Sequence, residues 1–308
     1  MDLNKQDEFI ENDELKIYRG EDFVVSKHIK IHQVTLGEIT DYGERDYYSM
    51  IYNFVATPQS YKVQLWDNGI DYTEITPYEL FYKMICGSLS HEKTSILFGD
   101  LDFKKFKIIP RKDDEKSFLL CQETYVGDIY NTSSDELVYQ FSSLLDASRF
   151  VGCSLEELIE TLSVSDTYKE YKFKNVSLEP IIIDEYTYNM IVDYIAKAHF
   201  IERDFRVPAN NSTKMVLIED ARDEMERNKN KEYHSSLKNL ISTMVNSEGF
   251  KYNHSQVWDM KINAFMDSVK RISKIKNADL LLQSGYSGYG INLKDIDKKQ
   301  LDWLGGLE

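Results

Sequence analysis

The sequence has little cysteine, no long hydrophobic run and a deficit of positive charge. Cysteine occurs three times in 308 residues, at Cys86, Cys121 and Cys153. An odd, scattered set without a CxxC pair argues against disulfides, metal binding and redox chemistry. A chain of this length can bury a core without such cross-links. We therefore expect free thiols in a reducing compartment, the first two of them in apolar surroundings.

Long apolar stretches are missing from the chain as well. The segment from Met1 to Leu15 is charged and holds nothing more apolar than Phe9-Ile10, so no signal peptide is expected. Elsewhere the uncharged apolar stretches are as short as Ile181-Ile182-Ile183, far below the ~20 residues that a membrane helix needs. We predict a cytosolic protein that has no membrane partner.

Positive charge is scarce: 37 basic residues face 52 acidic ones, and the formal net charge is −15. The acidic residues are spread along the chain, so the electrostatic field of the protein repels the phosphate backbones of nucleic acids. The best local exception is the group Lys270, Arg271, Lys274 and Lys276 on a predicted helix. This group is too small to outweigh its surroundings, and we predict no nucleic-acid partner.

The hydrophobic pattern predicts an α+β protein, because the apolar period changes from that of strands to that of helices along the chain. We expect a mixed N-terminal domain with a small antiparallel sheet, followed by a mainly helical C-terminal domain. The predicted segments are a polar N-terminal stretch at 1–27, an α+β domain at 28–184, a helical domain at 185–284 and a glycine-tethered tail at 285–308.

Local signals place the predicted elements within these segments. Thr35 and Glu38 form a capping box after two predicted strands, and Thr76 precedes a proline at the start of a second helix. From Tyr186 onward the pattern is helical. The predicted strands are 22–25, 29–34, 95–98 and a hairpin of 106–109 with 118–121, and two more helices are predicted from the capping boxes at 133–136 and 154–157.

Several short motifs suggest chemistry, but each has a simpler structural explanation. His28 and His32 lack a third metal ligand, and the acidic turn from Asp67 to Glu74 fails the order of a calcium loop. Other motifs fit helix caps, solvated faces or connectors better than active sites. They are Asp100 and Asp102 with two lysines, Ser235 with Lys238, the carboxylates from Glu219 to Glu226, and the glycines from Gly285 to Gly290. We therefore predict no catalytic residue, metal or cofactor.

The most informative stripe lies near the C-terminus. Trp258, Ile262, Phe265, Val269 and Ile272 recur at steps of four and three, which is a heptad seam on one side of a helix. That face must be covered. Packing within the domain and contact with another protein both satisfy the pattern, and such a seam also serves ordinary bundles.

A second candidate surface follows the glycine-rich connector. Trp303 and Leu304 stand in an otherwise charged tail, and a tryptophan anchor on a tether is typical of a docking peptide. The equal alternative is a tail that folds back on its own chain. We treat these two residues, together with the heptad seam, as the candidate partner-binding surface.

Two stretches resemble proteins of the tail-morphogenesis modules of long-tailed bacteriophages. One is Ile29 to Ile39 with the nearby phrases Tyr42-Gly43-Glu44, Thr57-Pro58 and Leu65-Trp66-Asp67, and the other is Trp258 to Ile272. The similarity touches residues 29–85 and 235–304 and is to the tail assembly chaperones. The chain is longer than many members of that class.

The resemblance implies a non-enzymatic protein of the host cytoplasm. Its partner would be a tape-measure protein, whose hydrophobic helical segments it would keep soluble, or other tail proteins, and it could form a homo-oligomer. A structural virion component of the tail or neck is the main alternative, and an unrecognised enzyme is a more distant one.

Overall fold

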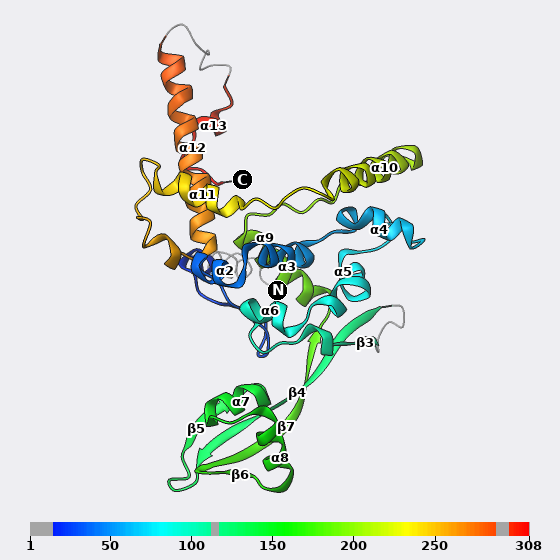
Figure 1. Ribbon diagram of the computed structural model, residues 1–308, viewed down its shortest axis with the longest axis vertical. Coiled ribbons are helices and arrows are strands. Elements are labelled where there is room, and N and C mark those ends of the chain that lie inside the picture. Colours follow the sequence, from blue (N-terminus) through cyan, green and yellow to red (C-terminus); the bar gives the residue numbers. More distant parts are fainter. Residues whose placement is uncertain (1–14, 112–116, 288–295, 308) are drawn as a thin grey trace, which may run out of the picture.

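The computed structural model describes residues 15–111, 117–287 and 296–307. Helices dominate, and the strands form small antiparallel sheets, which confirms the predicted α+β class (Figure 1). Of the predicted polar N-terminal segment, residues 1–14 lie outside this description. Residues 288–295 of the predicted connector do so too.

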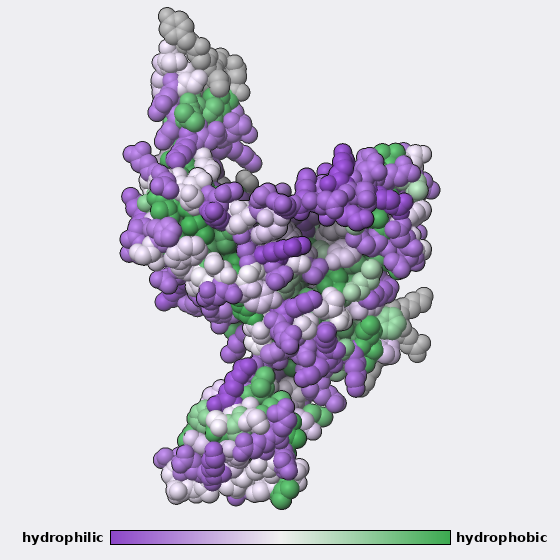
Figure 2. Space-filling view, in the orientation of Figure 1, coloured by the Kyte–Doolittle hydropathy of each residue, from purple (hydrophilic) through white to green (hydrophobic). Residues whose placement is uncertain are grey.

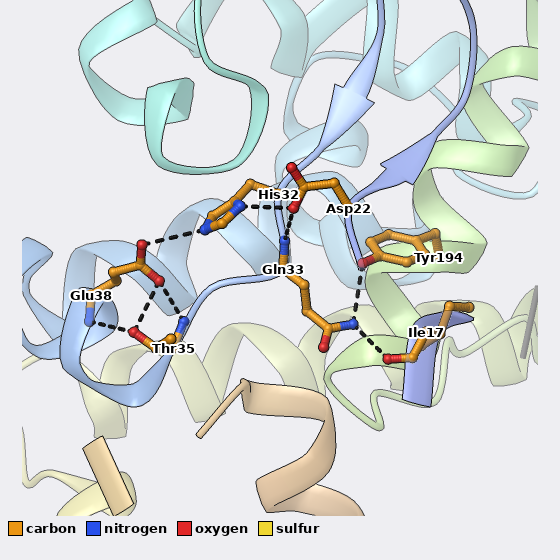
Figure 3. Close-up of polar contacts among 7 residues, drawn as sticks. All are labelled: Ile17, Asp22, His32, Gln33, Thr35, Glu38 and Tyr194. Atoms are coloured by element: carbon orange, nitrogen blue, oxygen red, sulfur yellow. Dashed lines mark hydrogen bonds and ion pairs between the residues drawn. The ribbon is translucent and has the colours of Figure 1, made fainter. Parts of the chain in front are cut away.

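The N-terminal part follows the local signals closely. β1 (Phe23–Val24) pairs antiparallel with β2 (Lys30–Ile31). The predicted capping box then starts α2 (Leu36–Tyr42): the Thr35 hydroxyl accepts a hydrogen bond from the Glu38 amide, and the Glu38 carboxylate accepts one from the Thr35 amide (Figure 3). A glycine at φ +104° separates this helix from α3 (Glu44–Val55).

Short helices continue the body. Thr76 caps α5 as predicted, with a proline at the first helical position. In chain order the elements are a 3-10 turn (Pro58–Tyr61), α4 (Lys62–Asp67), α5 (Pro77–Leu80), a π-helical turn (Phe81–Ile85), a 3-10 turn (Cys86–Ser88), α6 (His91–Phe98) and a 3-10 turn (Phe103–Lys105).

The larger sheet is built around two long strands. β3 (Lys107–Pro110) and β4 (Phe118–Asn131) form the predicted hairpin, and β4 pairs along most of its length with β7 (Tyr171–Ile183). β5 (Leu137–Phe141) pairs with the far end of β4, and β6 (Thr167–Tyr168) with the start of β7. All these pairs are antiparallel.

A register shift in β4 separates two hydrophobic cores. Before the shift, which lies between Val126 and Asp128, the buried positions of β4 are Leu120, Thr124 and Val126; after it, Ile129 is buried. The second core belongs to a small lobe, residues 127–174, that includes α7 (Leu144–Val151) and α8 (Leu155–Val164). β4 and β7 connect this lobe to the body (Figure 1).

The remaining helices return to the body or project from it. They are α9 (Glu185–Ala198), α10 (Asn211–Asn228), α11 (Ser236–Val245), α12 (Ile262–Tyr286) and α13 (Lys298–Leu301), with a 3-10 turn (Val257–Asp259) before α12. The main core draws on residues from Ile29 to Phe265, on both sides of position 185.

Two local predictions are wrong. Residues 95–98 were expected as a strand but belong to α6, where Leu97 and Phe98 are buried on one helical face. Residues 133–136 were expected to start a helix but form a turn into β5, with Asp135 at φ +54°. Tertiary packing overrides the local signal at residues 95–98. At residues 133–136 a competing local turn does so, because the Asn131 side-chain oxygen accepts hydrogen bonds from the amides of Ser133 (2.9 Å) and Ser134 (3.2 Å).

Polar contacts fix the first residues of the body against α9. The Gln33 amide donates to the Ile17 carbonyl (2.9 Å) and to the Tyr194 hydroxyl (3.3 Å). His32 lies between Asp22 (2.8 Å) and Glu38 (3.3 Å) (Figure 3). Segments more than 150 residues apart are therefore joined by side chains in this small region.

A buried polar pair joins α3 to the end of α9. The Tyr47 hydroxyl lies 2.6 Å from Nε2 of His199, and Nδ1 of His199 lies 2.7 Å from the Ile195 carbonyl oxygen. The carbonyl can only accept, so Nδ1 carries the hydrogen and Nε2 accepts from tyrosine. Burial lowers the pKa of His199 to about 4, and the hydrogen bond to Ile195 opposes this only in part.

This pair predicts a pH-dependent stability. Unfolded histidine titrates near pH 6.5, whereas folded His199 stays neutral down to about pH 4. The contribution of neutral His199 to the free energy of unfolding is therefore complete above pH 6.5. It is lost as the pH falls from 6.5 to 4, at up to about 1.4 kcal/mol per pH unit. Urea unfolding of His199→Gln should show a shallower loss of stability between these pH values. The exposed control His234→Gln should keep the wild-type slope, and an unchanged slope in His199→Gln would refute the assignment.

Candidate protein-interaction surface

The base of α12 is fixed to the N-terminal part of the body. The amide of Leu36 donates to the carbonyl of Met260, and the amide of Ile262 donates to the carbonyl of Val34, both at 2.9 Å. Gly37 permits this approach, because a Cβ there would lie 3.2 Å from the Trp258 carbonyl oxygen. The two stretches that carry the phage resemblance are thus neighbours in the structure.

The predicted heptad seam divides into a core part and a peripheral part. The helix begins at Ile262, so Trp258 lies outside it, in the preceding 3-10 turn. Ile262 and Phe265 are fully buried in the main core and are inaccessible to a partner. Trp258, Val269 and Ile272 are partly buried and pack against that core. Packing within the chain therefore accounts for the first half of the seam.

Beyond Ile272 the helix leaves the core and projects from the body (Figure 1). The described C-terminal residues fold back along it, with α13 packed against α12. We call residues 273–287 and 296–307 the C-terminal arm. Gly285 and Tyr286, expected in a connector, continue α12. The arm carries exposed apolar side chains, among them Leu280, which is 65% exposed.

Basic side chains of α12 hold the tail by its main chain. The Arg271 guanidinium donates to the carbonyls of Trp303 (2.8 Å) and Gly305 (2.9 Å), and the Lys274 ammonium donates to that of Gly306 (2.5 Å). The fold-back alternative for the tail therefore describes this structure. Both candidate anchors remain open to solvent: Trp303 is 47% exposed and Leu304 is 73% exposed.

The basic group on α12 has intramolecular roles throughout. Besides the two residues that hold the tail, Lys270 lies 4.6 Å from the ring centre of Phe200, and the Lys276 ammonium is 3.4 Å from the Ser247 hydroxyl. A groove of about 640 Å³ lies between the helix and the tail. Two charges of this cluster, those of Arg271 and Lys274, thus hold the tail, and the other two contact residues outside the arm.

The residues of the suggested chemical motifs are largely engaged in structural contacts. Ser235 caps α11, and Asp102 caps a 3-10 turn. Asp100 pairs with Arg149 of the small lobe at 2.5 Å. His28 binds Glu179 at 3.0 Å. Within the described residues, no three histidine, cysteine or acidic side chains are arranged to hold a metal ion.

The acidic helix α10 is a second projection (Figure 1). The ammonium of Lys214 lies 2.5 Å from a carboxylate oxygen of Asp71, and Arg222 pairs with Asp67. The hydrogen bond from Lys214 lowers the pKa of Asp71 to about 2. The loop from Asp67 to Glu74 therefore serves as an anchor for α10. None of the helices in the described ranges is long and apolar enough to span a membrane.

One apolar surface was missed by the sequence interpretation. The outer face of the β3–β4–β7 sheet exposes Ile109, Tyr125, Leu178 and Ile182, and the register places Tyr125 opposite Leu178. In the structure, exposed Ile182 alternates with the buried residues Ile181 and Ile183. This alternation was hidden because the triple isoleucine looks uniformly apolar in the sequence.

The arm contacts predict a specific effect of removing Arg271. Arg271→Ala deletes two charge-assisted hydrogen bonds to the tail, which should raise hydrogen exchange of residues 296–307 about tenfold. Mass spectrometry of exchanged peptides measures this directly. Lys276→Ala is the matched control, because Lys276 contacts Ser247 instead of the tail. Equal protection in both variants would contradict the proposed clamp.

The C-terminal part of the chain matches a known family model. Residues 228–308 match the model of a family described as the YomV second domain, which is of phage origin. The match covers about a quarter of the chain and includes α11, α12 and the whole C-terminal arm. A search of curated proteins and a search of solved structures each found no match. The C-terminal part of this chain is therefore similar to a phage-derived domain family, in agreement with its resemblance to phage proteins.

Proposed function

We propose that this chain is a non-enzymatic assembly protein of a bacteriophage, and that it acts in the host cytoplasm as a tail assembly chaperone or scaffold. Its partner would be a hydrophobic helical segment of a tape-measure-like protein. The observation that carries the proposal is the C-terminal arm, a projecting helix with exposed apolar side chains inside the residues that match a phage domain family.

The geometry of the arm supports a contact role. An amphipathic helix of a partner binds where apolar side chains line a helical surface, and exposed apolar residues grouped on a projection favour such contacts. Leu280, Trp303 and Leu304 provide apolar surface on the arm, and Figure 2 shows hydrophobic atoms among hydrophilic ones on this projection and on the body and lobe. A strongly acidic carrier would also keep a bound hydrophobic segment in solution.

A structural role in the virion is the second candidate, and the shape of the chain favours it. The described part of the chain is extended, because three parts project from the body (Figure 1). The lobe, α10 and the C-terminal arm account for this extended form (Figure 1). Subunits that bury projections against neighbours have such shapes. Detection of the chain in purified particles would favour this role over that of a chaperone.

Co-expression tests the chaperone proposal. A tape-measure protein of the same phage should become soluble and co-purify when the full-length chain is present. A Leu280→Glu/Leu304→Glu variant should lose most of this effect, because two charges would enter the apolar surface of the arm. Val164→Glu is the matched control: Val164 is 88% exposed on the small lobe, outside the matched residues.

Two results would contradict the proposal. One is a tape-measure protein that stays insoluble with the wild-type chain. The other is equal rescue by wild type, arm variant and control, which would move the contact away from the arm. Circular dichroism of the purified variants checks that each of them keeps its helix content.

A further inference from the structure

A wide cleft of the described molecule lies between the body and the small lobe. It has a volume of about 800 Å³, within the range of small-molecule and peptide sites. His28 and His91 come from the body, Gln122 from β4 and Asp146 from the lobe. The cleft is therefore distinct from the C-terminal arm and lies outside the residues that match a family.

Four polar side chains of this cleft have a buried atom without a hydrogen-bond partner, and one of these atoms, Oδ1 of Asp100, forms an ion pair with Arg149 at 2.5 Å. Three atoms then lack any partner. They are Nδ1 of His28, Nε2 of His91 and the side-chain oxygen of Gln122. The side chain of His28 is only 9% exposed. Buried polar atoms are normally paired, since an unpaired one costs about 1–3 kcal/mol. Their grouping in one cleft indicates a ligand that pairs with them.

The contacts of His28 define the chemistry that this ligand needs. Nε2 of His28 lies 3.0 Å from a carboxylate oxygen of Glu179, so Nε2 carries the hydrogen in the neutral ring. Nδ1 is then a lone-pair acceptor. The oxygen of Gln122 can only accept as well. A group that satisfies both must donate hydrogen bonds.

The charge of the cleft selects a cation. Five carboxylates line it, against three lysines. Lys105 pairs with Asp102, Arg149 with Asp100, and Lys27 with Glu179, so three carboxylates and one lysine of the lining stay outside these ion pairs. The five carboxylates are Asp22, Asp100, Asp102, Glu123 and Asp146. A guanidinium or ammonium group compensates this excess and supplies several N–H donors, whereas an anion would be repelled.

We propose that this cleft binds a guanidinium or primary ammonium group, with His28 and Gln122 as its hydrogen-bond acceptors. An arginine or lysine side chain of a partner protein and a free polyamine carry the same chemistry. The site is independent of the function proposed for the C-terminal arm, and it would give the molecule a second point of recognition.

Titration of the full-length protein with short probes tests the site. Histidine-labelled protein is titrated with the peptide acetyl-Ala-Arg-Ala-amide, with its neutral citrulline analogue and with spermidine, and carbon-correlated NMR spectra are recorded. The arginine peptide should shift the His28 and His91 signals saturably, with a Kd on the order of 1 mM. The citrulline peptide should bind at least about tenfold more weakly.

Matched variants separate binding at this site from binding elsewhere. Gln122→Met should weaken the arginine peptide about tenfold, by loss of one charge-assisted hydrogen bond. Gln140→Met is the control, because the Gln140 amide lines the same cleft but already donates to Asp128 at 2.8 Å. Thermal unfolding confirms that both variants fold, and Gln122→Glu, which adds a negative charge, should bind more tightly.

Saturable binding of the peptide alone supports a protein side chain as the ligand, and binding of spermidine as well supports free cations too. Equal binding of arginine and citrulline peptides would overturn the cationic assignment. So would the absence of saturable shifts in folded wild-type protein, or equal affinity of the Gln122→Met and Gln140→Met variants.

Discussion

Two backbone hydrogen bonds join the first elements of the body to the base of the C-terminal helix. They run between Val34–Leu36 and Met260–Ile262, and the capping box of Thr35 and Glu38 lies in the same place. Because this contact fixes the start of α12, it also fixes the direction in which the rest of that helix leaves the body. The exposed arm is a consequence of how its base is buried.

The same region determines where the core lies. Phe265, one turn into α12, is fully buried beside residues from the N-terminal part, and the Tyr47–His199 pair links α3 with α9 across the interior. A histidine held neutral by burial makes this interior sensitive to acid. The lobe has a separate core and joins the body through two long strands, so the cleft at this junction is bordered by both parts.

Many side chains that suggest chemistry in the sequence make contacts within the chain. Basic side chains that appear in the sequence as a patch are used to hold the tail. The motif residues that suggest active sites are for the most part caps and ion pairs. What remains available is apolar surface on projections, above all on the arm that lies within the phage-derived family match, and a polar cleft with unpaired acceptors.

The sequence by itself determined the elements that depend on neighbouring residues. Capping boxes at Thr35 and Thr76, the serine caps at Ser154 and Ser235, and the hairpin of β3 with β4 all rest on contacts within a few positions, so they could be predicted. The heptad stripe likewise predicted a helix whose apolar side must be covered.

Only the tertiary structure decided which surfaces are covered and which stay open. Ile262 and Phe265 share one stripe with Val269, but only the first two are fully buried. Their burial depends on how far each position lies from the core, and a periodic sequence pattern does not contain that distance. The same holds for Ser95 to Phe98, whose helical state depends on packing, and for β7, whose partner lies some fifty residues earlier in the chain. The cleft residues His28 and Gln122 are 94 positions apart, and no local signal relates them, because only the paired strands and the turn after β1 bring them to one place.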